Sequence, residues 1–386
     1  MSELSYLEKL LDGVKVEWKT LEKVLKRTKG TKITAGQMKA LHKDNAPLKI
    51  FAGGKTVAFV DFKDIPEKDI NREPSIIVKS RGIIEFEYYD KPFSHKNEMW
   101  SYHSNNDAIS IKYIYYFLKI NEGYFQKIGG KMQMPQIATP DTDKFEVPIP
   151  CPDNPEKSLA IQSEIVRILD KFTAVTAELT AELTAELNMR KKQYNYYRDQ
   201  LLNLEGRENT REMRIGDIYD FQYGTGNTIP KSGGQYPVYG SNGIVGSHDK
   251  YNSEDSPVIG HIGAYAGIVN WGQGKHFVTY NGVICRHKSK EVLQKYAYYL
   301  LLLQDFGSKS NSASQPFVSY NILNAPIVLV PPLQEQARIV AILDKFDTLT
   351  NSITEGLPRE IELRQKQYEY YRDLLFSFPK PETASN

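Results

Sequence analysis

Two stretches of the chain share one pattern of apolar positions. From Ile165 to Leu187, and again from Ile339 to Ile361, apolar residues recur at intervals of three and four, which places them on one face of an α-helix. The two copies keep a constant separation without a gap, and both continue into tyrosine-rich segments at residues 190–199 and 364–373. An ungapped repeat of this length predicts two long helices that pack together as an antiparallel coiled coil.

The first repeat contains the tetrapeptide Thr-Ala-Glu-Leu three times in succession, at residues 176–187. Ala, Glu and Leu are strong helix formers, and a leucine at every fourth position continues the apolar stripe. In the second copy, Gly356 and Pro358 are expected to kink or briefly break the helix. Each helix could run for about 45 residues, or roughly 65–70 Å.

Residues 15–155 and 207–331 have a different pattern, in which short strand-like runs lie between glycine-containing turns. In the first segment the runs cover residues 48–51, 57–60, 75–78 and 83–86, and a helix is predicted near 109–120. In the second they cover 236–239, 257–260 and 267–270, with an Asn-Gly hairpin turn at 241–243 and a helix near 295–301. Each segment is therefore predicted to be a small α+β domain, and the two look like diverged copies.

The N-terminal residues 4–11 resemble the end of the first repeat, because a tyrosine and two leucines recur there at the same spacing as in Tyr197–Leu202. The predicted fold class is α+β: two small α+β domains separated by two long antiparallel coiled-coil helices, in a circular pseudo-two-fold repeat. The predicted parts are an N-terminal helix that completes the repeat (1–14), the first domain (15–155), a central helical region (156–206), the second domain (207–331) and a distal helical region (332–386).

Composition changes this picture little. A charged fraction of 25% and a hydrophobic fraction of 40% are ordinary for a soluble protein, and the net charge of +2 permits a nucleic-acid partner without arguing for one. No apolar run is long enough to span a membrane, and no secretory signal is recognisable. The only cysteines, Cys151 and Cys285, fit no metal or redox spacing, so a cytoplasmic location is expected.

Motifs for catalysis are missing from the sequence. The segment Gly53-Gly54-Lys55-Thr56 resembles the end of a phosphate-binding loop, but lysine stands at position 49 where that loop needs glycine, so a hairpin turn is predicted. The seven histidines have no metal-ligand spacing, and no amino-methyltransferase tetrapeptide occurs. The chain is therefore expected to be no enzyme, with no catalytic residue, metal ligand or cofactor of its own.

Candidate binding residues lie in polar loops of both domains. Arg, Lys, Asn, Gln and Ser on rigidly held loops are the residue types that read base edges and phosphates. In the first domain these candidates are Lys79, Ser80, Arg81, Lys91, His95, Lys96 and Asn105. In the second they are Asn242, His248, Lys250, His261, Tyr265, Lys275, Asn281 and Gln315.

The tyrosines near the two repeat ends are candidates for docking a protein partner. They alternate with Arg, Lys and Gln, and part of each group is expected to pack against the opposite helix. The remainder would form an aromatic surface that occurs twice. The candidates are Tyr194, Tyr196, Tyr197, Tyr368, Tyr370 and Tyr371.

This arrangement resembles the specificity (S) subunit of type I DNA restriction–modification enzymes along essentially the whole chain. The resemblance is carried by the two helical repeats, by the proline-rich strand ends at residues 147–152 and 330–336, and by the Thr-Ala-Glu-Leu run, which is similar to the subclass called type IC. It implies that each domain is a target recognition domain reading one half of a bipartite double-stranded DNA site. It also implies that the helices set the spacer and bind two methyltransferase (M) subunits, which recruit motor and nuclease (R) subunits.

The resemblance also implies that S-adenosylmethionine, ATP and Mg belong to the partner subunits, which methylate adenine and translocate DNA. The alternative is a scaffold that binds no DNA, in which two adhesive domains on a coiled coil tether other proteins. A nuclease or hydrolase would need an acidic cluster that the sequence does not suggest.

Overall fold

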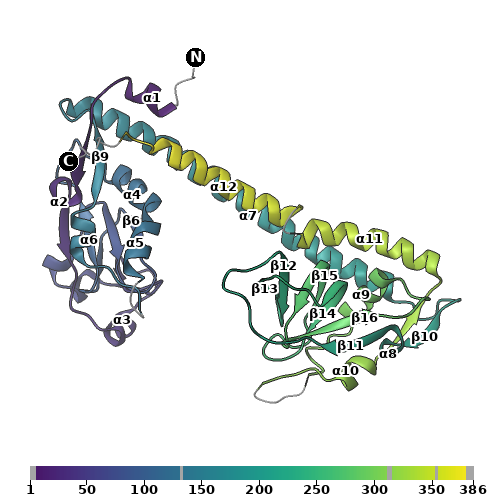
Figure 1. The fold of residues 1–386 in the computed structure, drawn as a ribbon. Coiled ribbons are helices and arrows are strands. Elements are labelled where there is room, and N and C mark those ends of the chain that lie inside the picture. Colours follow the sequence, from purple (N-terminus) through teal and green to yellow (C-terminus); the bar gives the residue numbers. More distant parts are fainter. Residues whose placement is uncertain (1–5, 131–133, 311–314, 353–354, 380–386) are drawn as a thin grey trace. The chain divides into compact units, whose positions relative to one another are not determined.

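The protein is described by a computed structural model that covers residues 6–130, 134–310, 315–352 and 355–379 (Figure 1). The chain divides into two compact units. Unit 1 combines Met1–Ala181 with Glu362–Asn386, and unit 2 is Glu182–Ile361. Each unit contains one of the two variable segments together with parts of both helical repeats.

The variable segment of unit 1 begins and ends in two strands that pair with each other. β1 (Val16–Thr20) runs antiparallel to β9 (Glu146–Pro150), and Val16 lies opposite Pro150. Helix α1 (Tyr6–Leu11) precedes β1, and α2 (Leu21–Val24) follows it. The chain therefore leaves the helical region and returns to it at one place.

Between these strands, unit 1 contains a four-stranded antiparallel sheet, in the order β2-β8-β5-β6, and a three-stranded mixed sheet, β4-β3-β7. Their strands are β2 (Lys26–Lys29), β3 (Leu48–Phe51), β4 (Val57–Val60), β5 (Ser75–Lys79), β6 (Glu85–Tyr89), β7 (Phe93–His95) and β8 (Trp100–His103). The helices are α3 (Ala35–Leu41), α4 (Ile111–Ile120), α5 (Glu122–Gly129) and α6 (Thr139–Asp143), with single 3₁₀ turns at Phe62–Asp64 and Glu67–Asp69. The strands predicted at 48–51 and 57–60 have these bounds, and the glycines between them form the predicted hairpin turn.

Helix α4 joins this domain to the C-terminal part of the chain. Its buried Tyr113 and Phe117 contact Phe376, with ring centroids 5.4 and 5.6 Å apart. The indole of Trp18 donates a hydrogen bond of 2.9 Å to the carbonyl of Pro379. Residues near both termini thus complete the apolar core of unit 1.

Unit 2 repeats this plan with a larger sheet. β10 (Arg211–Arg214) pairs antiparallel with β17 (Ile327–Val330), and the strands between them form a six-stranded sheet in the order β11-β16-β14-β15-β12-β13. Ser241 and Asn242 of the predicted turn join β12 to β13, and Gly243, the first residue of β13, has a φ of +77°, which glycine adopts without strain. The remaining elements are α8 (Ile215–Ile218), β11 (Tyr219–Tyr223), β12 (Tyr236–Gly240), β13 (Gly243–His248), β14 (Ser253–Gly260), β15 (Val269–Val278), β16 (Gly282–His287), α9 (Gln294–Leu302) and α10 (Tyr320–Asn324).

The first helical repeat is one continuous helix, α7 (Pro155–Leu202), of 48 residues. The second is divided into α11 (Leu333–Asn351) and α12 (Leu357–Leu375), with 19 residues each. The break lies where Gly356 and Pro358 predicted it, and Gly356 adopts a φ of +83°. Ile353, which belongs to the predicted apolar stripe, lies outside the described residues.

The two repeats pack antiparallel. In unit 1, Phe172 of α7 stacks on Tyr371 of α12, with centroids 5.7 Å apart. In unit 2, Tyr197 of α7 stacks on Phe346 of α11, also at 5.7 Å. Tyr197 and Tyr371 hold matching positions in the repeat, as do Phe172 and Phe346. The same aromatic pair therefore forms twice with the roles of the two copies exchanged, which confirms the predicted antiparallel, pseudo-two-fold arrangement and the α+β fold class.

A buried glutamine fixes each repeat helix to its domain. Gln162 accepts a hydrogen bond from the amide of Ser110 at 2.9 Å and donates one to the carbonyl of Ala108 at 3.0 Å. Gln336, at the matching repeat position, makes the same two bonds with the backbone before α9, at 2.7 and 3.0 Å. Because an unpaired buried polar group costs about 1–3 kcal/mol, these bonds favour one placement of each domain on its helix.

Candidate nucleic-acid interface

In unit 1, the turn between β5 and β6 is bridged to the segment that precedes α6. The amide of Gly82 donates to the carbonyl of Pro135 at 2.8 Å, and the amide of Ile137 donates to the carbonyl of Ser80 at 3.0 Å. Arg81 lies opposite Gln136 in this isolated bridge. Both of these side chains are exposed, on a backbone held by hydrogen bonds at either side.

Unit 2 builds the same frame from the turn between β14 and β15. The amide of Gly263 donates to the carbonyl of Pro316 at 2.8 Å, and the amide of Val318 donates to the carbonyl of His261 at 2.9 Å. Ile262 lies opposite Phe317 in this bridge. The sequence interpretation recognised both turns but not their partner segments. A Pro-x-Ile or Pro-x-Val tripeptide at corresponding distances after each turn was the available signal.

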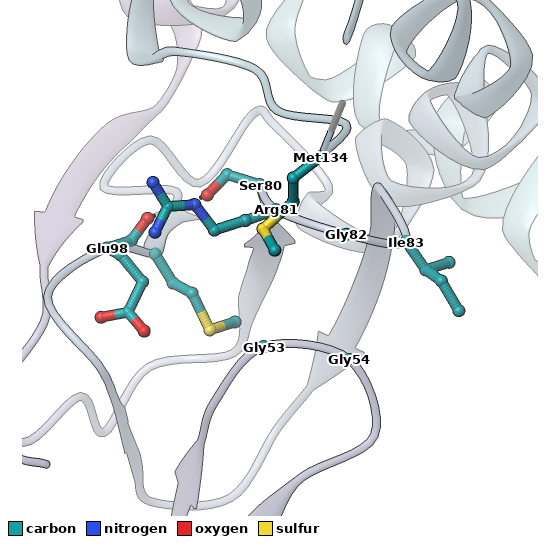
Figure 2. A pocket seen from close by; sticks show the side chains of 9 residues that line it. Gly53, Gly54, Ser80, Arg81, Gly82, Ile83, Glu98 and Met134 are labelled. Carbon is teal, nitrogen blue, oxygen red and sulfur yellow. Dashed lines mark hydrogen bonds between the residues drawn. The ribbon is translucent and has the colours of Figure 1, made fainter. Parts of the chain in front are cut away.

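A pocket of about 370 Å³ opens beside the bridged turn of unit 1. Figure 2 shows Arg81 and Glu98 on one side of it, opposite the hairpin turn of Gly53 and Gly54. The pocket is lined by Gly53, Gly54, Ser80, Arg81, Gly82, Ile83, Glu98, Met99 and Met134. It therefore combines a largely apolar wall with one cation and one carboxylate.

Three residues of unit 1 that were expected to be exposed are buried. Lys79 ends β5 and makes ion pairs with Glu85 at 2.6 Å and Glu87 at 2.8 Å. Burial alone would lower the pKa of Lys79, but the hydrogen bonds and charges of both glutamates outweigh it and raise that pKa. Its charge is thus neutralised inside the protein rather than offered to DNA.

Ser80 and His95 are the other two buried candidates. The hydroxyl of Ser80 donates to the carbonyl of Glu98 at 2.8 Å. The ring nitrogens of His95 contact the carbonyl of Lys96 and the hydroxyl of Ser101, both at 3.1 Å, and burial lowers the pKa of His95. Both side chains therefore support the loops from inside.

The remaining candidates of unit 1 do reach the surface. Lys91 and Asn105 are exposed, and Asn105 lines a second, polar pocket with the segment 22–27. Lys96 is half-buried and pairs with Glu98 at 2.6 Å. Arg81 and Ser80 line the first pocket, and Lys96 reaches its carboxylate, so part of the predicted set converges on one site.

Unit 2 also buries one candidate. His261 is buried at one end of a stack of three aromatic rings. Tyr223 is the middle ring, and its centroid lies 4.1 Å from that of His261 and 4.3 Å from that of Tyr320. Tyr280 packs edge-on against His261 at 5.2 Å and is exposed. The sequence interpretation missed this stack, because its members come from four separate elements or loops.

The other candidates of unit 2 are exposed or half-buried and lie at several places on the unit. His248 is half-buried and stacks on Phe277, and its Nδ1 accepts a hydrogen bond from the amide of Lys250 at 2.9 Å. Lys275 lies over the ring of Tyr251. Asn281 is half-buried, whereas Asn242, Lys250, Tyr265, Lys275 and Gln315 are exposed. Residues 311–314, which precede Gln315, lie outside the described residues.

The tyrosines of the repeat divide into packed and exposed members. Tyr194 is buried, and Tyr368 contacts the hydroxyl of Thr173 at 3.1 Å. Tyr197 and Tyr371 form the interhelical stacks. Tyr196 and Tyr370 are 62% and 64% exposed, and each packs edge-on against the next tyrosine along the chain. The same small aromatic surface therefore occurs once in each unit.

The family model described as "Type I restriction modification DNA specificity domain" matches residues 15–189 and 207–363. The chain belongs to this family. The two matches of this specificity-domain family each take in one variable segment and most of the helical repeat that follows it. Among curated relatives, the EcoR124I/EcoR124II specificity subunit of Escherichia coli is 40% identical over the whole of both chains. The EcoprrI specificity subunit of E. coli is 38% identical over 92% of this chain and 93% of that one.

Two solved structures share this fold. A chain from a structure of the type I R-M system matches with a TM-score of 0.59 at 13% identity, over 94% of this chain and 97% of that chain. The S subunit from M. genitalium matches with a TM-score of 0.50 at 18% identity, over 96% and 98% of the two chains. Within the described residues, no helix has the length and apolarity to cross a membrane, and no group of three or more His, Cys, Asp or Glu side chains is placed to hold a metal ion.

Proposed function

We propose that this chain is the DNA-specificity subunit of a type I restriction–modification complex, in which each variable domain reads one half of a bipartite duplex site. The observation that supports this most is the bridged loop frame, which occurs once in each unit with different side chains on the same backbone. A duplicated frame with different side chains is what two different half-sites require, because base identity is read by side chains on rigidly held backbone.

The proposed DNA-contacting residues are those candidates that reach solvent. In unit 1 they are Arg81, Lys91, Lys96 and Asn105, and in unit 2 Asn242, His248, Lys250, Tyr265, Lys275, Asn281 and Gln315. Lys79, Ser80, His95 and His261 support the loops instead. The proposed recognition domains are residues 15–155 and 207–331, joined by helical regions at 156–206 and 332–386, and residues 1–14 complete the repeat.

The helical regions hold the two domains apart and dock two adenine methyltransferase subunits on the duplicated tyrosine surface. Motor and nuclease subunits join through that complex. S-adenosylmethionine, ATP and Mg are bound by the partner subunits, and this chain contributes recognition without catalysis. The Thr-Ala-Glu-Leu run supports assignment to the type IC subclass.

The decisive experiment is to produce the chain with its methyltransferase partner in cells that lack adenine methylation, and to map methylated adenines across the genome. The expected result is one asymmetric bipartite motif, which disappears when the methyltransferase is produced alone. In vitro, binding of the complex to duplex DNA should weaken steeply with salt, because each neutralised phosphate contributes about −0.9 to the slope of log K against log salt.

The alternative function, a scaffold that tethers proteins without DNA, predicts no motif and no steep salt dependence. Observing either a random methylation pattern or salt-independent DNA binding would rule out the specificity function.

A further inference from the structure

Arg81 is one of the residues that line the pocket of unit 1. Its Nε and Nη2 donate to Oε1 of Gln136 at 3.1 and 3.0 Å. Within the described part of the chain, Nη1 has no hydrogen-bond partner. Since the guanidinium carries five N–H groups in a rigid fork, the edge formed by Nη1 and Nη2 stays available for a ligand with two acceptors.

Glu98 also lines this pocket. Its Oε1 binds the ammonium of Lys96 at 2.6 Å. Burial alone would raise the pKa of Glu98, but the hydrogen bond and charge of Lys96 outweigh it and lower that pKa. The carboxylate is therefore ionised at neutral pH, and Oε2 remains as an acceptor.

The two groups are held by the backbone around them. The buried hydroxyl of Ser80 ties the turn of Arg81 to the carbonyl of Glu98, and Gly82 is bonded to Pro135. Across the pocket, Gly53 and Gly54 have open space where a side chain would begin. The backbone that carries Arg81 and Glu98 is thus held in place before DNA binds, which lowers the ordering cost of binding.

This pair of charges suits a base pair better than a phosphate. In the major groove a G·C pair presents two acceptors on guanine, N7 and O6, beside a donor on cytosine, the N4 amino group. Arg81 offers the two donors and Glu98 the acceptor. A phosphate would meet the repulsion of the carboxylate, and the ammonium of Lys96 is already paired with that carboxylate.

We propose that Arg81 and Glu98 together read one G·C base pair in the half-site of unit 1, with Gln136 as a positioning residue for the guanidinium. This inference rests on the proposed function and assigns a base pair to one site within it. In unit 2 the corresponding bridge carries Ile262 and Phe317, which offer no such pair of charges. Recognition by this pair therefore belongs to one half-site only.

The test uses the complete methyltransferase complex and a duplex library in which the half-site of unit 1 is randomised one base pair at a time. Methylation rates give the preference at each position. Arg81→Ala and Glu98→Ala should each reduce the preference for G·C at the same position by roughly ten- to hundredfold. Arg81→Lys should behave like Arg81→Ala, because a lysine cannot replace the fork.

The matched control is Arg72→Ala, which removes an exposed arginine that is likewise paired with a glutamate, Glu67 at 2.8 Å, but away from the pocket. It should leave every preference unchanged. Gln136→Ala should weaken the same G·C preference less than Arg81→Ala does, without moving it to another position.

Several results would overturn the inference while the proposed function stands. One is that Arg81→Ala and Glu98→Ala relax the base preference at two different positions, at all positions equally, or at none. Two others are that Arg81→Lys keeps the G·C preference, or that a variant changes the half-site of unit 2. If Arg81→Ala or Glu98→Ala prevents assembly, Arg81→Lys, which keeps the charge, decides alone. A wild-type complex without any bipartite motif would instead contradict the proposed function itself.

Discussion

Tyr196 and Tyr370 are matching residues of the repeat whose rings contribute little to packing. Each is more than 60% exposed, and each lies edge-on to the neighbour that stacks across the helices. Because interface hot spots are rich in tyrosine, we expect Tyr196→Ala to weaken the docking of one methyltransferase subunit by about 1–2 kcal/mol, roughly tenfold in Kd. Tyr370→Ala should weaken the other to the same degree. Native mass spectrometry under dilution should then show complexes with one methyltransferase subunit.

The double variant should lose both subunits at the same concentration. Tyr124→Ala is the control, since Tyr124 is an exposed tyrosine on α5, away from the repeat. The Tyr124→Ala complex should keep both methyltransferase subunits bound. If Tyr196→Ala and Tyr370→Ala also keep both methyltransferase subunits bound, the tyrosine surface is not the docking site.

At the level of single residues, the sequence did not predict which candidate side chains are exposed. Lys79 is polar and follows a strand, which suggested a surface turn, but β6 brings two glutamates against it. His95 lies at the end of β7, and the hydroxyl that its ring contacts belongs to Ser101 of β8. Glu98 and Gln136 were overlooked for the same reason. Partners that strand pairing brings from distant positions determine burial, and one sequence does not specify that pairing.

The element whose length carries the clearest prediction is α7. The division between the two units falls inside its Thr-Ala-Glu-Leu run, between Ala181 and Glu182. One such unit of four residues adds about 6 Å of helix. Since DNA rises about 3.4 Å per base pair, deleting Thr180–Leu183 should shorten the spacer between the half-sites by roughly one to two base pairs. Methylation mapping should show both half-sites unchanged.

Inserting one extra Thr-Ala-Glu-Leu unit is the matched control and should lengthen the spacer by the same amount. An unchanged spacer in either variant, or an altered half-site, would contradict the proposal that the helices set the distance.

The helices themselves were predictable because their apolar period and their break are local properties of the sequence. The Gly356–Pro358 interruption is an example. Short strands were located to within a few residues, since β-branched runs and glycine turns mark them. The pairing of β1 with β9, and of β10 with β17, was not predicted, because these partners are more than a hundred residues apart.

For the whole molecule, those two pairs matter most. Each brings the first and last strands of a variable segment together, with Val16 opposite Pro150 in unit 1 and Arg211 opposite Val330 in unit 2. A segment whose ends are adjacent can be exchanged without extending the chain that receives it. The circular repeat is therefore consistent with two exchangeable domains on one helical frame.

We expect that replacing residues 15–155 with the corresponding segment of another family member will change one half-site and leave the other half-site and the spacer as they were. The structure adds a condition. The graft must supply an apolar face for Phe376, which Tyr113 and Phe117 of α4 supply in this chain, because the core of unit 1 includes these residues.

A parallel graft with Asp at the position of Phe117 is expected to lower the thermal stability of unit 1. Since we propose that residues 207–331 read the half-site of unit 2, that half-site should survive in both grafts. A graft that folds stably and still changes both half-sites in the methylation map would show that the two domains do not read DNA independently.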